Sequence, residues 1–394
     1  MSTLRQLFLN NLAQTSESPL AIDIEKAKGI YLCSKSGKKY IDLISGISVS
    51  NLGHCNSQVI KAVNSQIKKF SYLMVYGEYV ISPQVELATK LVSLLPENLN
   101  SVYFVNSGSE AVEGGIKLAK RFTGRHKIMS FKNAYHGSTS GALSLMGNEF
   151  FKQEFRPLLP GIDFIRFNNF EDLERINEDY ACVIIEPIQG EAGIQIPEKN
   201  YLQALREKCY QTNTLLIFDE IQTGIGRTGK MFAFENFNVI PDILLLAKAF
   251  GGGFPLGAFV SSRHIMSTLS HNPPLGHITT FGGHPVSCVA SLESLKILEE
   301  TKIYESAVSK GQLFKKLLKH KKIVEIRQIG LFISVELENE LMVKNVIDFA
   351  IQNGVITDWF LFAPNCIRIA PPIIITEKEI RKACKIINQG IEKA

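Results

Sequence analysis

The sequence lacks several features that would place it in a class at once. Its 394 residues contain no apolar run near the roughly 20 residues that a membrane-spanning helix needs. Residues 1–18 carry one basic residue and a short apolar patch without a small-residue cleavage site, so we predict no signal peptide. The seven cysteines show no C-x-x-C spacing, which indicates reduced thiols and a cytoplasmic protein.

Motifs of several other protein classes are missing too. The eight histidines have no metal-ligand spacing, there is no G-x-S-x-G elbow, and FGGGFPLG at 250–257 does not fit G-x-G-x-x-G. The net charge is only +5. The densest basic run, 315–322, lacks interleaved aromatic residues and is typical of a solvated helix face. We therefore predict no bound metal, no nucleic-acid partner and no membrane partner.

The chain does contain a regular alternation of short apolar runs and helix-like segments. The runs, each followed by polar or glycine residues, lie at 101–111, 126–137, 180–193, 213–226, 242–253 and 256–262. Helical periodicity separates them, for example at 109–122 and 199–212. Strands that alternate with helices favour right-handed crossovers and an α/β fold with a mostly parallel central sheet.

The pattern changes near residue 290. Helical segments and apolar runs then follow without regular alternation, which predicts a smaller α+β domain, and residues 29–43 resemble a hairpin around a Ser-Gly turn. We predict an N-terminal segment at 1–50 that packs with the small domain, a large domain at 51–290 and a small C-terminal domain at 291–394.

The first apolar run ends in Asn106, Ser107, Gly108 and Ser109, where a helix is predicted to begin. A helix N-terminus rich in hydroxyls and glycine offers backbone N–H groups and a favourable dipole to a phosphate. Taken by themselves, the same residues favour ordinary helix capping. The phosphate-binding interpretation stays open beside it.

Later runs end in side chains that are costly to bury. Glu186 and Asp219 each follow an apolar run, and a carboxylate there needs a partner. Tyr135 and His136 end another run, where an aromatic ring either stacks on a flat ligand or packs in the core. Parallel strands bring such ends to one crevice.

Lys248 follows the apolar residues 243–246 and precedes three glycines at 251–253. In isolation it fits a surface lysine at the start of a loop. Together with a phosphate cradle, a stacking aromatic and a buried aspartate, it fits one ligand, pyridoxal phosphate. The lysine amine forms a Schiff base with the aldehyde, and the aspartate keeps the pyridinium nitrogen protonated.

Four segments carry a resemblance to a known family: FVNSGSEAVEGGIKLA, EPIQGEAG, TTFGGHPVSC and the long segment that starts FDEIQTGIGRTGK and ends AKAFGGGFPLGA. In this order they resemble the class-III pyridoxal-phosphate aminotransferases, which include acetylornithine, ornithine and 4-aminobutyrate aminotransferases. The resemblance implies the aspartate-aminotransferase-like fold (fold type I), a homodimer with sites at the subunit interface, and ping-pong transfer of an amino group to 2-oxoglutarate.

The resemblance also implies roles for single residues. Lys248 would be the Schiff-base lysine and the base that moves the substrate proton, and Asp219 would pair with the pyridinium nitrogen. Gln222 would bond the phenolic oxygen of the ring, with Ile221 and Tyr135 on its two faces. The phosphate and the remainder of the cofactor site would involve Ser107, Gly108, Ser109, His136, Glu186, Thr279 and, from the partner subunit, Thr280.

Arg368 matches the family's carboxylate-binding arginine, and Glu191 its ion-pair partner. A guanidinium binds a carboxylate through two parallel hydrogen bonds. Arg368 would therefore release Glu191 when glutamate or 2-oxoglutarate enters, and pair with it again for the other amine. The alternative is a structural arginine on a strand.

The sequence departs from the family pattern in the substrate region. Ser138 stands where ornithine and acetylornithine enzymes usually have an arginine for the far carboxylate, and TSESPLAI at 15–22 lacks a helping tyrosine. Ile47 follows the acetylornithine and 4-aminobutyrate pattern. We assign no role to His284 or Ala249, which replace an asparagine and a glycine. The hypothesis is that the partner amine lacks a carboxylate at its far end or holds it differently.

The sequence leaves three alternatives to an acetylornithine-type transaminase open. The first is a 4-aminobutyrate- or diamine-type ω-transaminase. The second is an aminomutase or decarboxylase on the same fold, which would not need the exchange between Arg368 and Glu191. The third is a cofactor-binding module of a regulator, although the sequence carries neither a helix-turn-helix segment nor a basic nucleic-acid face.

Overall fold

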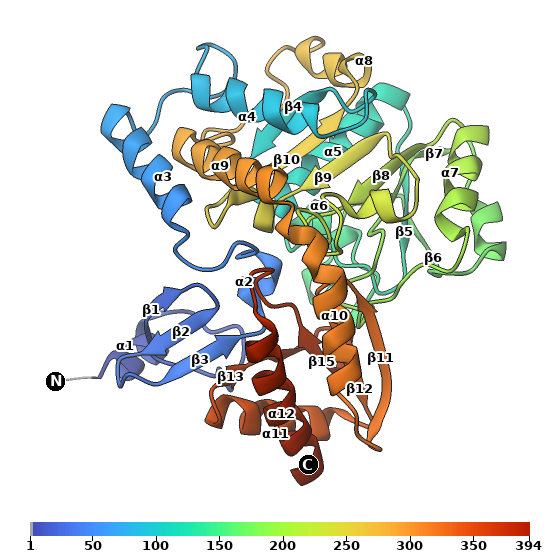
Figure 1. The fold of residues 1–394 in the computed structure, drawn as a ribbon. Helices are drawn as coiled ribbons and strands as arrows, with labels where there is room; N and C mark the ends of the chain where they lie inside the picture. The colour runs from blue at the N-terminus through green and yellow to red at the C-terminus, as the bar shows by residue number, and fades with distance from the viewer. Residues whose placement is uncertain (1–2) are drawn as a thin grey trace.

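The computed structural model describes residues 3–394, which fold around three sheets (Figure 1). The largest has seven strands in the order β4-β10-β9-β8-β7-β5-β6. Strand β10 is antiparallel to both neighbours and the other pairs are parallel, as predicted. The strands are β4 (Ser101–Val105), β5 (Lys127–Phe131), β6 (Ile162–Ile165), β7 (Tyr180–Ile185), β8 (Leu215–Asp219), β9 (Ile243–Leu246) and β10 (Gly257–Ser261).

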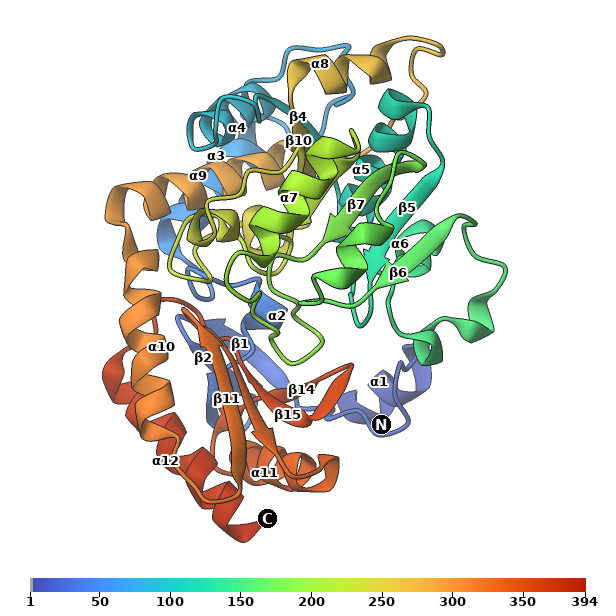
Figure 2. The same cartoon turned by 90° about the vertical axis from the view of Figure 1, so that its right-hand side faces the viewer.

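Both faces of this sheet are covered by helices (Figures 1 and 2). Strand β8 shows why: Leu216 and Phe218 enter one apolar cluster, whereas Leu215 and Ile217 enter the cluster on the opposite face. One face packs against α5 (Gly108–Thr123), α6 (Ser140–Ser144) and α8 (Arg263–Met266), the other against α3 (Ser57–Lys69), α4 (Ser82–Ser93), α7 (Tyr201–Gln211) and α9 (Pro285–Thr301).

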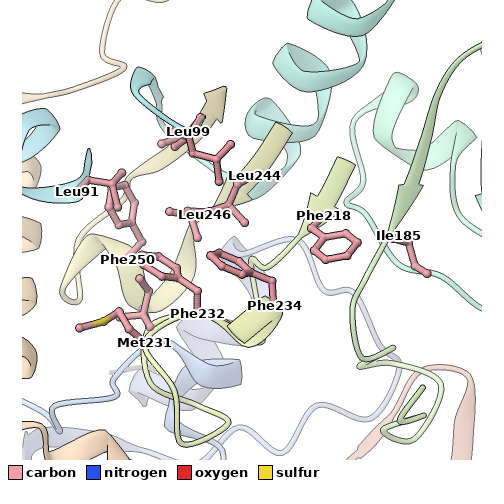
Figure 3. Close-up of a cluster of buried hydrophobic side chains, with 14 of the residues drawn as sticks. Leu91, Leu99, Ile185, Phe218, Met231, Phe232, Phe234, Leu244, Leu246 and Phe250 are labelled. Atoms are coloured by element: carbon pink, nitrogen blue, oxygen red, sulfur yellow. The ribbon is translucent and has the colours of Figure 1, made fainter. Parts of the chain in front are cut away.

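The larger cluster anchors the segments that leave the strand ends (Figure 3). Phe218 directly precedes Asp219, and Phe250 follows Lys248 by two residues; both phenylalanines are fully buried. Burying a side chain of this size contributes about 1.5–3 kcal/mol. On the opposite face, a β-carbon at Gly114 would lie 2.2 Å from the Phe259 ring, so glycine lets α5 approach the sheet closely.

The remaining elements form a second body below the sheet (Figures 1 and 2). One sheet contains β1 (Ile24–Lys28), β2 (Tyr31–Ser34), β3 (Lys39–Asp42) and β13 (Val355–Ile356), and the other contains β11 (Ile323–Ile329), β12 (Phe332–Leu337), β15 (Ala363–Ile369) and β14 (Asp358–Phe360). Their helices are α10 (Ser306–Leu317), α11 (Glu340–Gln352) and α12 (Glu377–Lys393), with α1 (Leu4–Asn11) and α2 (Ser45–Ser48) at the N-terminal side.

The N-terminal and C-terminal parts of the chain meet in this body. The predicted hairpin is present as β2 and β3, and β3 pairs in parallel with β13. Ile30, Ile41 and Leu43 share an apolar cluster with residues of β12 and β15. The proposed domain boundaries stay predictions, and α9 runs across the one at residue 290 while it packs on α3 and α4.

One sequence-based expectation is incomplete. The sequence pattern does not predict β6, the outermost strand next to β5, because its four residues include the charged Asp163 and form no continuous apolar run. Within residues 3–394, no helix combines the length and the apolar character that crossing a membrane requires.

Candidate active site

A cavity of about 420 Å³ lies at the carboxyl ends of the parallel strands. Its size is in the range of small-molecule sites. Its lining comes from the loops that follow β4, β5, β7, β8 and β9 and includes Ser107, Gly108, Ser109, Tyr135, His136, Glu186, Asp219, Ile221, Gln222 and Lys248. The structure therefore brings together the predicted cofactor-binding residues except Thr279 and Thr280.

Lys248 lines this cavity, so the surface interpretation is wrong. It begins the 3₁₀ turn η5 (Lys248–Gly251) with a φ of 50°, a left-handed backbone that L-residues adopt rarely. Burial lowers the pKa of its amine, although Glu191 and Asp219 oppose that effect. Within residues 3–394 the amine has no hydrogen-bond partner, which leaves it available for chemistry.

The first turn of α5 forms one end of the cavity. Ser107 is the N-cap of this helix, and its hydroxyl accepts a hydrogen bond from the Glu110 backbone N–H at 3.2 Å. The capping interpretation is thus correct for Ser107. The same helix end still borders the cavity through Gly108 and Ser109, where the helix dipole favours an anion.

Gly137 closes tightly onto this helix end. Its φ is 126°, and a β-carbon there would lie only 2.2 Å from the Ser109 hydroxyl oxygen. The next residue, Ser138, donates its backbone N–H to that hydroxyl at 3.3 Å. A side chain at position 137 would therefore displace Ser109 from the cavity wall.

Asp219 has a partner that the sequence did not identify. One of its carboxylate oxygens lies 2.7 Å from Nδ1 of the buried His136, and the other accepts the Ile221 backbone N–H at 3.0 Å. A carboxylate behind an apolar run indicates that some partner is needed, but β7 separates the two strands involved, so local sequence could not name the histidine.

Glu186 holds the loop that carries Tyr135. It accepts backbone hydrogen bonds from Tyr135 at 3.0 Å and from Gly190 at 2.9 Å. Burial raises the pKa of Glu186 to about 7, so this carboxyl is partly protonated near neutral pH. This loop restraint fixes the position of the aromatic ring that faces the cavity.

The cavity walls fit pyridoxal phosphate. His136 Nε2 and Gln222 Nε2 are buried and have no hydrogen-bond partner in the described chain, which is costly unless a ligand supplies one. A β-carbon at Gly108 would lie 3.0 Å from the Ile221 side chain, so the helix end and this apolar wall are close together. An anion-binding end, an apolar wall, a carboxylate and a reactive amine match the parts of that cofactor.

Arg368 and Glu191 form the predicted ion pair. The two guanidinium Nη atoms donate to the two carboxylate oxygens at 2.8 Å each, and both side chains are buried. Burial opposes the charge on Glu191, but the Arg368 guanidinium outweighs it and the pKa of Glu191 lies below its usual value. The sequence did not identify Asp358, whose Oδ1 lies 3.0 Å from Arg368 Nε.

Several predicted residues lie outside the cavity lining. Thr279 accepts a hydrogen bond from the Asn106 side chain at 3.0 Å, and the exposed Thr280 accepts one at its carbonyl from Tyr72 at 2.8 Å. Ile47 lies in the turn before Val49, which lines the cavity instead. The exposed Ser138 hydroxyl is 3.3 Å from the Tyr135 hydroxyl. Their predicted roles stay predictions.

His284, for which the sequence offered no role, caps a helix. Its Nδ1 accepts a hydrogen bond from the Val286 backbone N–H at 3.3 Å at the start of α9. The ring also lies 5.9 Å from that of Tyr72 in a stacked arrangement. The substitution at this position is thus compatible with a structural function.

Comparison with known proteins places these features in a family. The profile of the class-III aminotransferases matches residues 12–391. An acetylornithine aminotransferase of Clostridium acetobutylicum is 37% identical over 386 residues, with 94% of this chain and 96% of that protein covered. A [LysW]-aminoadipate semialdehyde/glutamate semialdehyde transaminase of Sulfolobus acidocaldarius is 36% identical, with 94% and 95% covered.

Solved structures agree with the sequence comparison. An ornithine aminotransferase from Toxoplasma gondii, whose structure contains pyridoxal phosphate at partial occupancy, is 30% identical with a TM-score of 0.90 and covers 98% of this chain and 92% of its own. A transaminase from Virgibacillus is 29% identical with a TM-score of 0.92, covering 98% and 97%. The chain belongs to the class-III aminotransferases and is a transaminase with the fold-type-I architecture and pyridoxal phosphate as its cofactor.

Proposed function

We propose that the protein moves an amino group between glutamate or 2-oxoglutarate and a second substrate, an amine or ω-amino acid, in two half-reactions. The observation that supports this most strongly is the Arg368–Glu191 pair, which is close enough to Lys248 for both charges to affect the pKa of its amine. Because Glu191 fills the guanidinium fork as a substrate carboxylate would, the pair marks a carboxylate site that the protein itself can close.

The residues of the cavity would divide the work of each half-reaction. The bound cofactor supplies an electron sink for the charge that develops at the substrate α-carbon. Lys248, with its lowered pKa, moves the proton at that carbon as a neutral amine. Asp219 would keep the ring nitrogen protonated, and the hydrogen bond with His136 fixes the orientation of this carboxylate.

The other contacts orient the cofactor. Ser107, Gly108 and Ser109 at the end of α5 would hold the phosphate, together with Thr280 of the partner subunit. Gln222, whose Nε2 has no partner in the described chain, would donate to the phenolic oxygen of the cofactor, and Ile221 and Tyr135 would pack on its ring. Such fixed dipoles and contacts reduce the reorganisation needed during the reaction.

One site can thus accept two different substrates. With glutamate or 2-oxoglutarate, Arg368 leaves Glu191 and binds the substrate carboxylate near the reacting carbon. With an amine that carries no carboxylate there, Glu191 stays in the fork, so no buried guanidinium is left unpaired. An aminomutase or decarboxylase needs no such exchange, so the pair favours a transaminase.

Two observations bear on the far end of the second substrate. Relatives named acetylornithine aminotransferase support an ω-amino acid of that kind. Ser138, however, offers an exposed hydroxyl beside Tyr135 where a guanidinium would hold a far carboxylate. We infer that the preferred amine lacks a carboxylate at that position or holds it differently, as a diamine- or 4-aminobutyrate-type substrate would.

A homodimer in the cytoplasm completes the proposal. Helix α1 has no buried residue, and Leu4, Leu7 and Leu12 on and beside it are exposed, which fits a surface that a second copy covers. The exposed Thr280 fits a contribution to the partner's phosphate site. All seven cysteines are free, in agreement with a reducing compartment.

Spectra of the two half-reactions test the function. The protein loaded with pyridoxal phosphate is mixed with glutamate, which should convert the aldehyde form of the cofactor to the amine form, and 2-oxoglutarate should reverse the change. A panel of N-acetylornithine, ornithine, 4-aminobutyrate and 1,4-diaminobutane then ranks the second substrate. No conversion by glutamate would disprove the proposed donor, and a wide preference for acetylornithine or ornithine would disprove the inference from Ser138.

A further inference from the structure

We propose that Asp358 is a positioning residue for Arg368, which holds the Nε side of the guanidinium fixed while the opposite edge exchanges Glu191 for a substrate carboxylate. The inference rests on the proposed use of Arg368 as the carboxylate-binding residue. It adds a residue that neither the sequence motifs nor the cavity lining identify.

The placement of Asp358 is set by the backbone. Strands β14 and β15 are antiparallel, and Asp358 is directly opposite Arg368 in their register. Oδ1 of Asp358 lies 3.0 Å from Nε of Arg368, and their side chains are only 19% and 3% exposed. Neither atom has a hydrogen-bond partner in residues 3–394, because the N–H is poorly aligned, so the attraction between them is mainly Coulombic.

All three residues of β14 contact the same guanidinium. Besides Asp358, the Trp359 carbonyl accepts a hydrogen bond from Nη2 at 3.0 Å, and the Phe360 ring lies 4.5 Å from the guanidinium carbon. Glu191 supplies the contacts on the remaining edge. When Glu191 leaves, one short strand therefore still defines the plane and the direction of the fork.

The exchange keeps the number of anionic groups beside the Arg368 guanidinium constant. While Glu191 is paired with Arg368, two carboxylates, those of Glu191 and Asp358, face the guanidinium. When a substrate carboxylate replaces Glu191, two carboxylates again face it. Burial raises the pKa of Asp358 to about 6, with Glu191 adding to that effect and Arg368 opposing it, so Asp358 is mostly ionised above neutral pH. The substrate thus replaces one anion by another beside a counter-ion that does not move.

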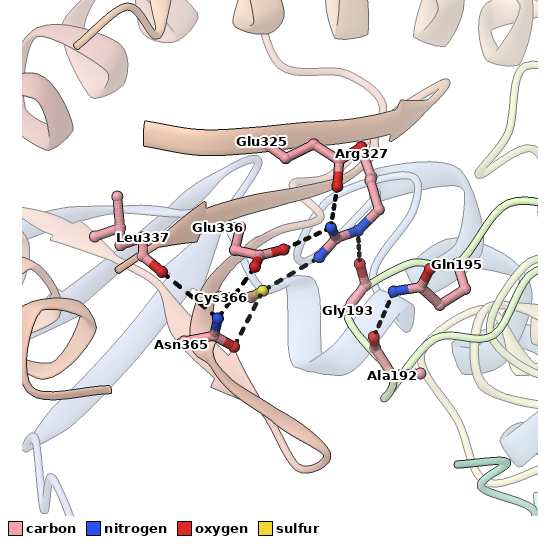
Figure 4. Close-up of polar contacts among 9 residues, drawn as sticks. All are labelled: Ala192, Gly193, Gln195, Glu325, Arg327, Glu336, Leu337, Asn365 and Cys366. Carbon is pink, nitrogen blue, oxygen red and sulfur yellow. Dashed lines mark hydrogen bonds and ion pairs between the residues drawn. The ribbon is translucent and has the colours of Figure 1, made fainter. Parts of the chain in front are cut away.

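The segment after β14 holds the other member of the pair. Leu361 donates its backbone N–H to Glu191 Oε2 at 3.1 Å, and Phe362 donates to the Glu191 carbonyl at 3.1 Å. Figure 4 shows how Arg327 on β11 donates to the Gly193 carbonyl at 2.7 Å and to Cys366 Sγ at 3.3 Å. These contacts fix the backbone of the turn that carries Glu191 against the strand that carries Arg368, so the exchange needs only the Glu191 side chain to move and to give up its Leu361 hydrogen bond.

Binding of glutarate, a five-carbon dicarboxylate that cannot react, tests the proposal in the enzyme loaded with pyridoxal phosphate. Asp358→Asn keeps the shape of the side chain and removes its charge. We expect about tenfold weaker glutarate binding and a similar rise in the glutamate KM, with kcat and the affinity for pyridoxal phosphate within about twofold of wild type. Asp348→Asn makes the same chemical change at an exposed position of α11 and should alter none of these.

Further variants separate positioning from a structural function. In a Glu191→Gln background, the loss caused by Asp358→Asn should persist, because the guanidinium then depends on β14 alone. Asp358→Glu, which keeps the charge, should recover most of the glutarate affinity. If Asp358→Asn does not fold, Asp358→Ser, which has a smaller neutral side chain, carries the same measurement.

Two results would overturn the inference. One is glutarate binding within twofold of wild type in the folded variant. The other is an equal loss of glutarate affinity, cofactor affinity and thermal stability, which would make Asp358 a structural residue. Failure of the proposed function looks different, because wild-type protein would then show no spectral change with glutamate.

Discussion

The two halves of the site differ in the charged partners that the chain places beside their buried polar groups. At the strand ends, His136 Nε2 and Gln222 Nε2 are buried and have no hydrogen-bond partner in the described chain. On β15, Arg368 faces both Glu191 and Asp358. A cofactor that stays bound can satisfy the first set permanently. Substrates that come and go cannot, so the protein supplies its own anions to the arginine, since an unpaired buried charge costs several kcal/mol.

Loss of the Lys248 amine should have the largest effect on activity. Lys248→Ala should reduce turnover by at least about 1,000-fold, because the variant loses both the covalent attachment and the base that moves the substrate proton. Steady-state rates with glutamate and 2-oxoglutarate measure the effect. Cofactor affinity should fall far less, because the phosphate contacts remain; near-wild-type turnover would contradict the assignment.

Loss of the Arg368 guanidinium should weaken glutamate binding on the β15 side of the site. Arg368→Met should raise the glutamate KM about 10- to 150-fold, since a hydrogen bond to a charged group contributes roughly 1.5–3 kcal/mol. The variant also leaves Glu191 and Asp358 without their cationic partner. Arg368→Met with Glu191→Gln is therefore the control: it should regain part of the stability while glutamate binding stays weak, and recovery of glutamate binding would exclude Arg368 as its ligand.

The pH dependence of cofactor uptake sharpens the comparison. Burial lowers the pKa of Lys248 from 10.5, and only the neutral amine attacks the aldehyde. Uptake of pyridoxal phosphate by cofactor-free protein, followed by absorbance, should rise about tenfold per pH unit while the pH is below that pKa. It should level off well before pH 10.5. A continued rise to that pH would show an unperturbed lysine.

A methyl group added at Gly137, next to the proposed phosphate site, should have the smallest effect of these changes. Gly137→Ala places a β-carbon 2.2 Å from the Ser109 hydroxyl at a φ of 126°, with an expected strain of about 1–3 kcal/mol. Equilibrium titration should show cofactor binding weakened about tenfold. Gly124→Ala, at the far end of α5 with φ 70° and open space around it, should cost stability without changing cofactor affinity.

The sequence predicts which residues lie at the ends of the strands of the large sheet, because the patterns that indicate them are local. Apolar runs that end in Asp219 and Lys248 specify both the strands and the sheet edge where they meet. The pairing of His136 with Asp219 spans two strands that are not neighbours, so no local pattern contains it. Glu191 and Arg368 come from the resemblance and not from spacing.

The position of Asp358 next to Arg368 cannot be predicted from the sequence. Strand β14 has only three residues, and an irregularity after Trp359 shifts its register with β15. A strand this short has no readable alternation, and a shift of one residue would move Asp358 to the opposite face. Its position next to Arg368 is therefore a property of the assembled sheet.

The turn at 45–48 has a consequence for the order of folding. Its four residues all have φ between 49° and 64°, a left-handed winding that costs L-residues about 1–2 kcal/mol each, glycine excepted. Ser45 is held by the buried Arg227 at 3.2 Å and by the Ala370 carbonyl at 2.7 Å. We expect this turn to form only after the last strand of the chain has docked, so a nascent or truncated chain should lack the support that positions Val49 in the cavity wall.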